Sequence, residues 1–219
     1  MTKSILYDDW FLSILPKTKE ILPREFDVIF KYLESLNLQY YTICETGCIR
    51  SLTQFDWQGN FTILANRFVE IHNGIVYTVN IDLEAINLCK SLLHVKATCA
   101  DSVDYLNKLE NIDSINFFYL DSMDINFDNP EPSIQHHYNE FLTIINRKNV
   151  GNFYLCIDDN INEKIQKGLK INNFLKKLNI LPLLNGYQSL YWINLSDFNK
   201  IKANYTYPNG IVVSILPKL

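Results

Sequence analysis

Apolar and polar positions along this chain follow two alternating patterns. Short runs rich in aliphatic, aromatic and β-branched residues predict buried strands, and longer stretches with periodic apolar positions predict amphipathic helices. The predicted strands are 40–45, 74–82, 95–101, 114–121 and 152–158, and the predicted helices are 61–72, 83–93, 102–110, about 133–147 and about 164–178. Because strands and helices alternate, we expect an α/β fold with a mostly parallel sheet and helices on both faces.

The two ends of the chain depart from this alternation. Residues 1–40 predict helices interrupted by prolines, and we interpret them as a helical N-terminal extension of a single domain, 1–219. Near the other end, the runs 187–195 and 209–216 are rich in β-forming residues with no clear helix between them. These two runs predict a C-terminal antiparallel hairpin that completes a seven-stranded sheet.

Composition indicates a globular chain that is long enough to bury a substantial core. Its 219 residues are 47% hydrophobic and 20% charged, with a formal net charge of -4. This charge gives no broad basic surface for nucleic acid, and no apolar run is long enough for a membrane span, so we expect neither partner and a cytoplasmic location. The five cysteines lack paired metal-binding spacing and predict reduced core residues. A homo-oligomer stays open.

Five predicted strands in succession end on acidic residues. Parallel sheets of this type bind ligands at the carboxyl ends of their strands, so these positions are the candidates for a site. They are Glu45, Asp82, Asp101, Asp121 and the pair Asp158 and Asp159. Each carboxylate alone is explained equally well as the cap of the helix that follows it. The uninterrupted succession favours a ligand site.

The first three strand ends favour a nucleoside ligand. Gly47 follows the first strand in a tight turn, where backbone N–H groups can approach a ligand. Asp82 follows the second strand, where a carboxylate can accept both hydroxyl protons of a ribose. Asp101 and Ser102 follow the third strand and either cap a helix or bind a purine amino group. Because no GxGxxG fingerprint is present, a pyrophosphate-containing dinucleotide is poorly supported.

The motifs ETG, VNID, CAD, YLD and IDDN, in this order between Tyr41 and Asn160, resemble those of class I S-adenosylmethionine-dependent methyltransferases. More narrowly, ETGCIR, LDSMD, PEPSIQHH, IDDN and GYQSLYW resemble a branch of methyltransferase-like proteins linked to glycan biosynthesis. The resemblance implies a Rossmann-like fold and S-adenosyl-L-methionine as cofactor. The cofactor contacts that it implies come from Glu45, Gly47, Asp82, Leu83, Asp101 and Ser102. The glycine-rich loop of that family is thin here.

The last two strand ends raise the question of a metal ion. Adjacent strands would bring Asp121, Asp159 and Asn160 close together, and clustered carboxylates repel unless one is protonated or a cation lies among them. Mg²⁺ prefers oxygen ligands of these kinds. The arrangement is similar to metal-dependent O-methyltransferases of the catechol and sugar types, which implies that Asp121, Asp159 and Asn160 hold Mg²⁺ or another divalent cation. Asp158 is an alternative ligand, and a metal-free cluster that only caps loops is the competing interpretation.

Three residues are candidates for the base that accepts the proton of a methylated hydroxyl. Asp124 occupies the place where related enzymes carry a lysine or aspartate base. His136 and His137 lie near the predicted start of the helix after the fourth strand, and histidine titrates close to neutral pH. Each histidine taken alone is better explained as a polar helix residue than as a catalyst, and His136 with Glu140 as an ordinary pair one turn apart.

Together with the strand-end carboxylates, the resemblance therefore implies an S-adenosylmethionine-dependent, metal-assisted O-methyltransferase that acts on a small-molecule acceptor, a sugar or a glycan precursor. Two other hypotheses stay open. The thin glycine loop also suits a protein that keeps this fold without catalysis and serves as a binding subunit in glycan assembly. A nucleotide-dependent dehydrogenase is disfavoured by the missing dinucleotide fingerprint.

Overall fold

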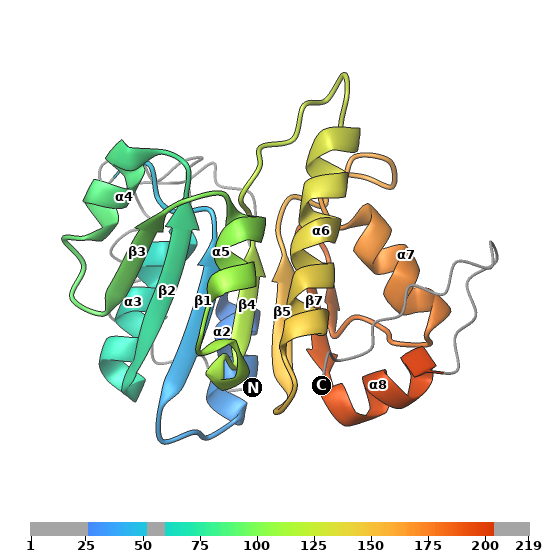
Figure 1. Ribbon diagram of the computed structural model, residues 1–219, viewed down its shortest axis with the longest axis horizontal. Helices are drawn as coiled ribbons and strands as arrows, with labels where there is room; N and C mark the ends of the chain where they lie inside the picture. The colour runs from blue at the N-terminus through green and yellow to red at the C-terminus, as the bar shows by residue number, and fades with distance from the viewer. Residues whose placement is uncertain (1–25, 52–59, 204–219) are drawn as a thin grey trace.

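The computed structural model describes residues 26–51 and 60–203, and the element labels follow Figure 1. The strands are β1 (Tyr41–Thr46), β2 (Gly74–Asn80), β3 (Val95–Cys99), β4 (Phe117–Leu120), β5 (Phe153–Ile157), β6 (Leu184–Asn185) and β7 (Ser189–Ile193). The helices are α2 (Phe26–Ser35), α3 (Asn60–His72), α4 (Leu83–Cys89), α5 (Ser102–Lys108), the 3₁₀ turn η3 (Ile112–Ser114), α6 (Glu131–Arg147), α7 (Leu169–Lys177) and α8 (Leu195–Ala203).

The described strands form one seven-stranded sheet in the order β3-β2-β1-β4-β5-β7-β6. The pairs among β1 to β5 are parallel, and β7 is antiparallel to both β5 and β6. The chain moves outward from β1 to β3 and then returns to place β4 on the other side of β1. Strand order therefore reverses between β1 and β4, which is where a fold of this kind forms its ligand crevice.

Helices cover both faces of this sheet, as predicted. Helices α5, α6 and α7 lie over the face toward the viewer in Figure 1, and α2 and α3 lie behind it. Alternate strand residues point to the two layers, so that Cys44 and Phe118 pack with the front helices while Ile43 and Phe117 pack with α2 and α3. The carboxyl ends of β1 through β5 therefore lie at one edge of a sheet that is covered on both faces.

Several boundaries differ from the sequence prediction. The helix predicted at about 164–178 begins only at Leu169, because Asn162 accepts hydrogen bonds from Lys164 N and Ile165 N and closes a tight turn first. The predicted absence of a helix after 187–195 is wrong, because α8 follows directly. The antiparallel partners of β7 are β5 and β6, and the run 209–216 lies outside the described residues.

Two further expectations are modified by the structure. Of the predicted extension 1–40, residues 1–25 lie outside the described part, and α2 buries Phe26 and Phe30 against α3 as part of the core. Four cysteines are buried free thiols as predicted, but Cys99 is exposed, because β3 is the edge strand of the sheet. No helix among the described residues is long and apolar enough to span a membrane.

Candidate functional site

The carboxyl ends of the parallel strands form one edge of the sheet. The turn after β1 connects the part of this edge formed by β1 to β3 with the part formed by β4 and β5. Gly47 has a φ of +87°, and a Cβ placed there would lie 2.3 Å from the carbonyl oxygen of Asp121. The N–H of Gly47 donates to Val79 O (2.9 Å), and that of Asp121 donates to Thr46 O (2.9 Å). Only glycine fits both the left-handed backbone and this close approach. The predicted contact of Gly47 with a cofactor stays a prediction, since residues 52–59 of the same turn lie outside the described part.

Glu45 is a buried member of this turn and not an open ligand contact. Its Oε2 accepts hydrogen bonds from the hydroxyls of Thr62 on α3 (2.8 Å) and Thr78 on β2 (2.9 Å). Burial raises the pKa of the Glu45 carboxyl well above its usual range, which favours the neutral acid. Thr62 also accepts a hydrogen bond from Ile49 N (2.9 Å), so this network orders the backbone beyond Gly47.

Asp82 at the end of β2 combines an exposed carboxylate with two exposed apolar neighbours. Its Oδ1 caps α4 by accepting from Glu84 N (2.8 Å), while no described residue is recorded as a hydrogen-bond partner of Oδ2. Ile81 and Leu83 flank it and are 77% and 56% exposed. Exposed apolar residues beside an available carboxylate oxygen are what an aromatic base and a ribose diol require.

The end of β3 places the two predicted residues differently. Asp101 is exposed and caps α5 through Oδ1, which accepts from Val103 N (2.9 Å) and Asp104 N (3.1 Å). Ser102 is buried, and its hydroxyl lies 2.8 Å from Nε2 of His136. The structure thus joins a predicted cofactor residue to a predicted catalytic residue through a contact between α5 and α6.

The ends of β4 and β5 meet around a buried lysine. Lys167 is fully buried, and its ammonium forms ion pairs with Oδ1 of Asp121 and with Oδ2 of Asp159, the latter at 2.9 Å. Tyr187 donates its hydroxyl hydrogen to the other oxygen of Asp159 (2.7 Å). Burial opposes the charged form of Lys167, but Asp121, Asp159 and Asp158 outweigh it and raise the pKa of Lys167. We call Asp121, Asp158, Asp159, Lys167 and Tyr187 the strand-end ion cluster.

A closed loop delivers Lys167 to this position. Asn160 and Gln166 form an antiparallel bridge, and Ile161 N donates to Ile165 O (3.0 Å), so the segment turns back on itself. Asp159 has a φ of +53°, a left-handed conformation that aspartate tolerates better than most residues. Lys167 consequently lies beside Asp159 in space, although eight positions separate them along the chain.

The predicted metal ligands do not fit a divalent ion in this arrangement. The ammonium of Lys167 takes the position between Asp121 and Asp159. Asn160 turns its amide nitrogen to the hydroxyl of Ser189 (2.6 Å). Among residues 26–51 and 60–203, no group of three or more His, Cys, Asp or Glu side chains has a metal-binding arrangement.

Asp124 is brought to the same edge but is held by an arginine. Both of its oxygens accept from Arg50, at 2.6 and 2.7 Å. This hydrogen-bonded pair keeps the pKa of the Asp124 carboxyl below its usual range. A carboxylate with a lowered pKa is a weak proton acceptor, so the predicted role of Asp124 as base is disfavoured, while a role in shaping the site with Arg50 is supported.

The two histidines of α6 occupy different environments. His137 is fully buried, its Nδ1 lies 2.7 Å from Ser133 O, and burial lowers its pKa to about 4. His136 is about one quarter exposed and bonded to Ser102, with Nε2 also 3.7 Å from Oε1 of buried Glu140. His136 is therefore the accessible candidate of the two for proton transfer, with the buried carboxylate of Glu140 nearby but beyond hydrogen-bond distance.

Sequence reasoning missed the residues that complete the site from other elements. Lys167 is one of three lysines in a polar stretch, and nothing in the spacing distinguishes it from Lys164 or Lys170. Thr62, Thr78 and Tyr187 are likewise ordinary helix, strand and turn residues until the fold places them. The His136–Glu140 spacing predicted only an ordinary side-chain pair one turn apart, and the structure places Nε2 and Oε1 of these residues 3.7 Å apart.

No protein-family model and no curated protein sequence matches this chain. Solved structures do. The methyltransferase MycE from the mycinamycin biosynthetic pathway, in complex with Mg, SAH and mycinamycin VI, has a TM-score of 0.54 at 11% identity over 78% of this chain and 50% of that one. A second MycE structure, with Mg and SAH, has a TM-score of 0.54 at 13% identity over the same shares of both chains.

A rRNA methylase from Streptococcus thermophilus has a TM-score of 0.48 at 9% identity, over 78% of this chain and 97% of that one. The chain spans about half the length of MycE. Together with the strand order, the MycE similarity establishes the Rossmann-like fold of class I methyltransferases for this protein. At this level of identity the comparison shows the fold alone.

Proposed function

We propose that this protein is an S-adenosylmethionine-dependent methyltransferase. The observation that carries the proposal is the end of β2, where exposed Asp82 uses one oxygen to cap α4 and its two chain neighbours, Ile81 and Leu83, are exposed apolar residues. This combination suits an adenosine, with the carboxylate on the ribose and the apolar residues on the base. In the sheet β2 lies beside β1, and the glycine-enforced turn at Gly47 brings the end of β1 to the end of β4.

S-adenosylmethionine supplies an electrophilic methyl group on a positively charged sulfur. In the proposed reaction an acceptor oxygen forms the new bond to this carbon, the carbon–sulfur bond breaks with its electron pair on sulfur, and the hydroxyl proton passes to a base. His136 is our candidate for this base, because it is accessible and its Nε2 faces Ser102 and Glu140. Asp124 is tied to Arg50, and His137 is enclosed.

We propose a hydroxyl of a sugar or glycan precursor as the methyl acceptor. The side chains of Asp121 and Asp159 are each 18% exposed, and carboxylates accept hydrogen bonds from neighbouring sugar hydroxyls. Met123 and Phe127, in the segment that rises between β4 and α6, are 41% and 63% exposed and offer apolar contact to a sugar ring. The glycan-linked motifs of the sequence support the same class. The proposed reaction uses no metal ion, because the ammonium of Lys167 lies between Asp121 and Asp159.

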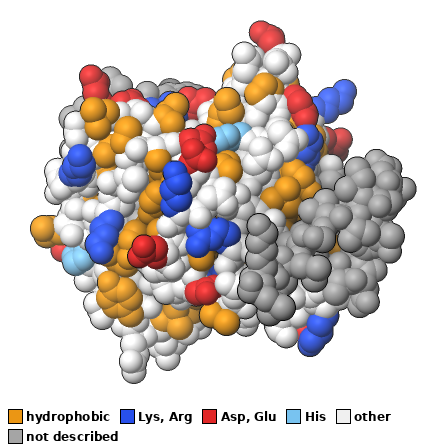
Figure 2. Space-filling model, in the orientation of Figure 1, with side chains coloured by type: hydrophobic (Ala, Val, Ile, Leu, Met, Phe, Trp, Pro, Cys, Tyr) orange, Lys and Arg blue, Asp and Glu red, His pale blue; other side chains and the backbone are white. Residues whose placement is uncertain are grey.

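We also propose that the protein acts in the cytoplasm without a nucleic-acid or membrane partner. The face in Figure 2 carries its lysine and arginine side chains in separated positions among acidic and hydrophobic ones. The formal net charge of -4 points the same way. A homo-oligomer is compatible with these features.

Calorimetric titration with S-adenosylhomocysteine and S-adenosylmethionine tests the cofactor, with NAD as the matched control. We expect binding of the first two and none of NAD. A methyl-transfer screen over nucleotide sugars, simple glycosides and a catechol then tests the acceptor, with the product mass as readout. Binding of NAD in place of S-adenosylhomocysteine would contradict the proposal.

A non-catalytic binding protein is the second candidate. The observation in its favour is that two of the three predicted bases are unsuited to accept a proton, one paired with arginine and one fully buried. Binding of S-adenosylhomocysteine without turnover of any acceptor, in a protein that retains its melting temperature, would favour this candidate over the enzyme.

A further inference from the structure

The strand-end ion cluster contains three carboxylates from two adjacent strand ends, and it requires a positive charge. Asp121 follows β4, while Asp158 and Asp159 follow β5, and the backbone N–H of Asp158 donates to Leu120 O (3.2 Å). Asp158 is completely buried. Carboxylates this close repel one another strongly away from water, so an uncompensated cluster would not be stable with all three ionised.

We propose that Lys167 is the resident cation of this cluster, so that the site works without a divalent metal ion. The inference concerns the site of the proposed function. It makes Lys167 a positioning residue, whose ammonium holds Asp121 and Asp159 in the orientation in which their exposed edges meet an acceptor. An acceptor hydroxyl is then recognised by hydrogen bonds to carboxylates and not by coordination to a metal.

The contacts of Lys167 show why a metal ion and this side chain exclude each other. Its ammonium is within ion-pair distance of both Asp121 and Asp159, and Mg²⁺ would have to approach the same oxygens to about 2.1 Å. The second oxygen of Asp159 already accepts from Tyr187, and the amide nitrogen of Asn160 donates to Ser189. Of the oxygens expected to bind a metal, both of Asp159 and Oδ1 of Asp121 are engaged in contacts within the protein, whereas Oδ1 of Asn160 has no hydrogen-bond partner among the described residues.

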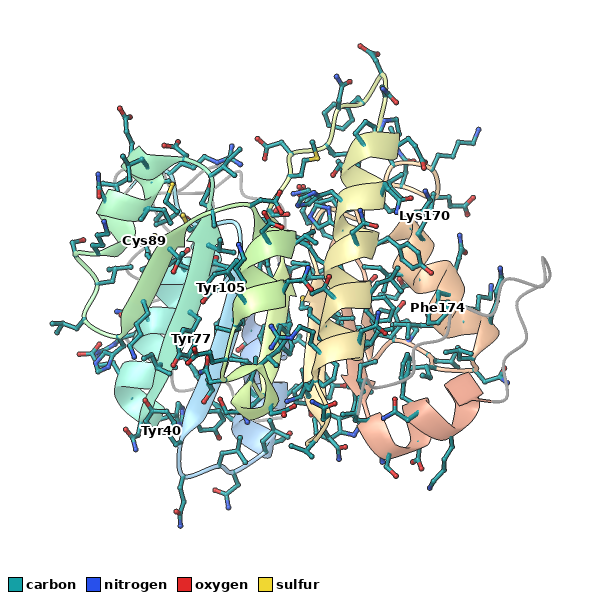
Figure 3. The ribbon with its side chains drawn as sticks, in the orientation of Figure 1. Tyr40, Tyr77, Cys89, Tyr105, Lys170 and Phe174 are labelled. Atoms are coloured by element: carbon teal, nitrogen blue, oxygen red, sulfur yellow. The ribbon has the colours of Figure 1, made fainter. Side chains whose placement is uncertain are left out.

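The backbone around Lys167 fixes this arrangement. The bridge between Asn160 and Gln166 closes the loop, and the N–H of Lys167 lies 3.4 Å from the carbonyl oxygen of Asp159. The side chain is 0% exposed, so it could leave the carboxylates only if the loop opened. Lys170, three residues further along the chain and within α7, is a matched contrast, because it bonds Glu131 and Gln135 of α6 and is 35% exposed (Figure 3).

Manganese binding, followed by the electron paramagnetic resonance of free Mn²⁺, tests the proposal in the full chain. We expect wild type and Lys170→Met to leave Mn²⁺ free up to about 1 mM, where an ordinary protein Mg²⁺ or Mn²⁺ site would be occupied. A stoichiometric Mn²⁺ site in wild type that Asp159→Asn removes would overturn the proposal. The wild-type measurement decides without any need for a Lys167 variant to fold.

Amine labelling with mass spectrometry supplies a second measurement on the wild-type chain. We expect Lys167 to be protected and Lys170 to be labelled, with the same ratio of labelling in about 10 mM Mg²⁺ as in EDTA. Exposure of Lys167 by Mg²⁺ would show that a metal displaces it and would refute the inference. Titration of S-adenosylhomocysteine into the same samples separates this inference from the proposed function. If S-adenosylhomocysteine does not bind, the proposed function is contradicted, while the result for Lys167 still stands.

Discussion

The two halves of the strand-end edge handle their carboxylates in opposite ways. At the ends of β2 and β3, Asp82 and Asp101 are exposed, and each uses one oxygen to cap the helix that follows. At the ends of β4 and β5, Asp121 and Asp159 converge on a buried lysine. The first half resembles a surface prepared for a ligand, whereas the second half is internally charge-compensated.

The physical difference lies in the solvent. An exposed carboxylate at a helix N-terminus is stabilised by water and backbone N–H groups, so it remains available without a counter-charge. Buried carboxylates lose that hydration and become unfavourable unless a cation and hydrogen bonds replace it. We therefore expect substitutions at the ends of β2 and β3, where we propose that the nucleoside binds, to change cofactor affinity. Substitutions at the ends of β4 and β5, where we propose that the acceptor binds, should first change stability.

Lys167→Met should produce the largest effect, because it leaves buried carboxylates without their cation. The free energy of unfolding should fall by about 3–5 kcal/mol, the range for breaking a buried ion pair. Urea unfolding followed by circular dichroism measures it. Lys170→Met is the control and should cost under about 1 kcal/mol, since its partners lie at the surface. Equal losses in both variants would remove the contrast between the two halves.

Gly47→Ala tests the contact between the halves, where β1 approaches the end of β4. The added methyl group would meet Asp121 O at a backbone φ of +87°, so we expect a loss of about 3 kcal/mol from overpacking and strain together. Gly151→Ala is the matched control, since φ is +80° but the nearest atoms are 3.7 Å away. Its cost should be only the left-handed strain of about 1 kcal/mol, by the same urea titration.

The stability of the protein should also respond to pH, through the buried His137 of α6. Burial lowers its pKa to about 4, so the unfolded chain, with an ordinary histidine pKa of about 6.5, binds the proton more readily. The stabilisation is complete above about pH 6.5 and is lost as the pH falls toward 4. Between about pH 7.5 and about pH 5 this amounts to about 2 kcal/mol. His137→Gln should remove this dependence of the free energy of unfolding on pH, as measured by urea unfolding at each pH. If the variant keeps the pH dependence of the wild type, His137 is not a buried, neutral histidine.

Asp82→Ser should have the smallest effect on stability and a specific effect on binding. Serine caps a helix about as well as aspartate, so the free energy of unfolding should stay within about 0.5 kcal/mol. The affinity for S-adenosylhomocysteine should fall at least about tenfold, because a charged hydrogen-bond acceptor for the ribose is lost. Calorimetry on Asp82→Ser and Asp82→Ala separates the two roles of this carboxylate. Undiminished affinity in both variants would argue against a ribose at β2.

The fold was accessible from local pattern to a large extent. Five strand-like runs between helix-like segments predicted the parallel part of the sheet. Four of these strands are mostly buried, whereas β3, at the edge of the sheet, is partly exposed. The errors fell where tertiary contacts override local preference. The turn before α7 is closed by Asn162 and by the Asn160–Gln166 bridge. The β-rich run 187–195 was predicted to continue to Leu195, whereas β7 ends at Ile193 and Leu195 begins α8.

The candidate site divides along the same line. Asp82 and Asp101 were predicted correctly as residues at the carboxyl ends of strands, because a strand end can be located from one segment of sequence, while their contacts with a cofactor stay predictions. The contact between Ser102 and His136 and the burial of Glu45 beneath Thr62 depend on how helices pack on the sheet. Hydrophobic periodicity within one segment carries no record of which side chain from another segment it will meet.

By itself, the sequence determined the α/β alternation, the acidic residue at each of five strand ends and the glycine at the turn after β1. These follow from short-range preferences for burial, capping and backbone conformation, which act within a few residues. Only the tertiary structure decided that Lys167 stands between Asp121 and Asp159. Lys167 pairs with these carboxylates only because the loop after β5 closes and excludes water. The strength of such an ion pair depends on the distance between the charges and on the medium around them, and neither can be deduced from one segment of sequence.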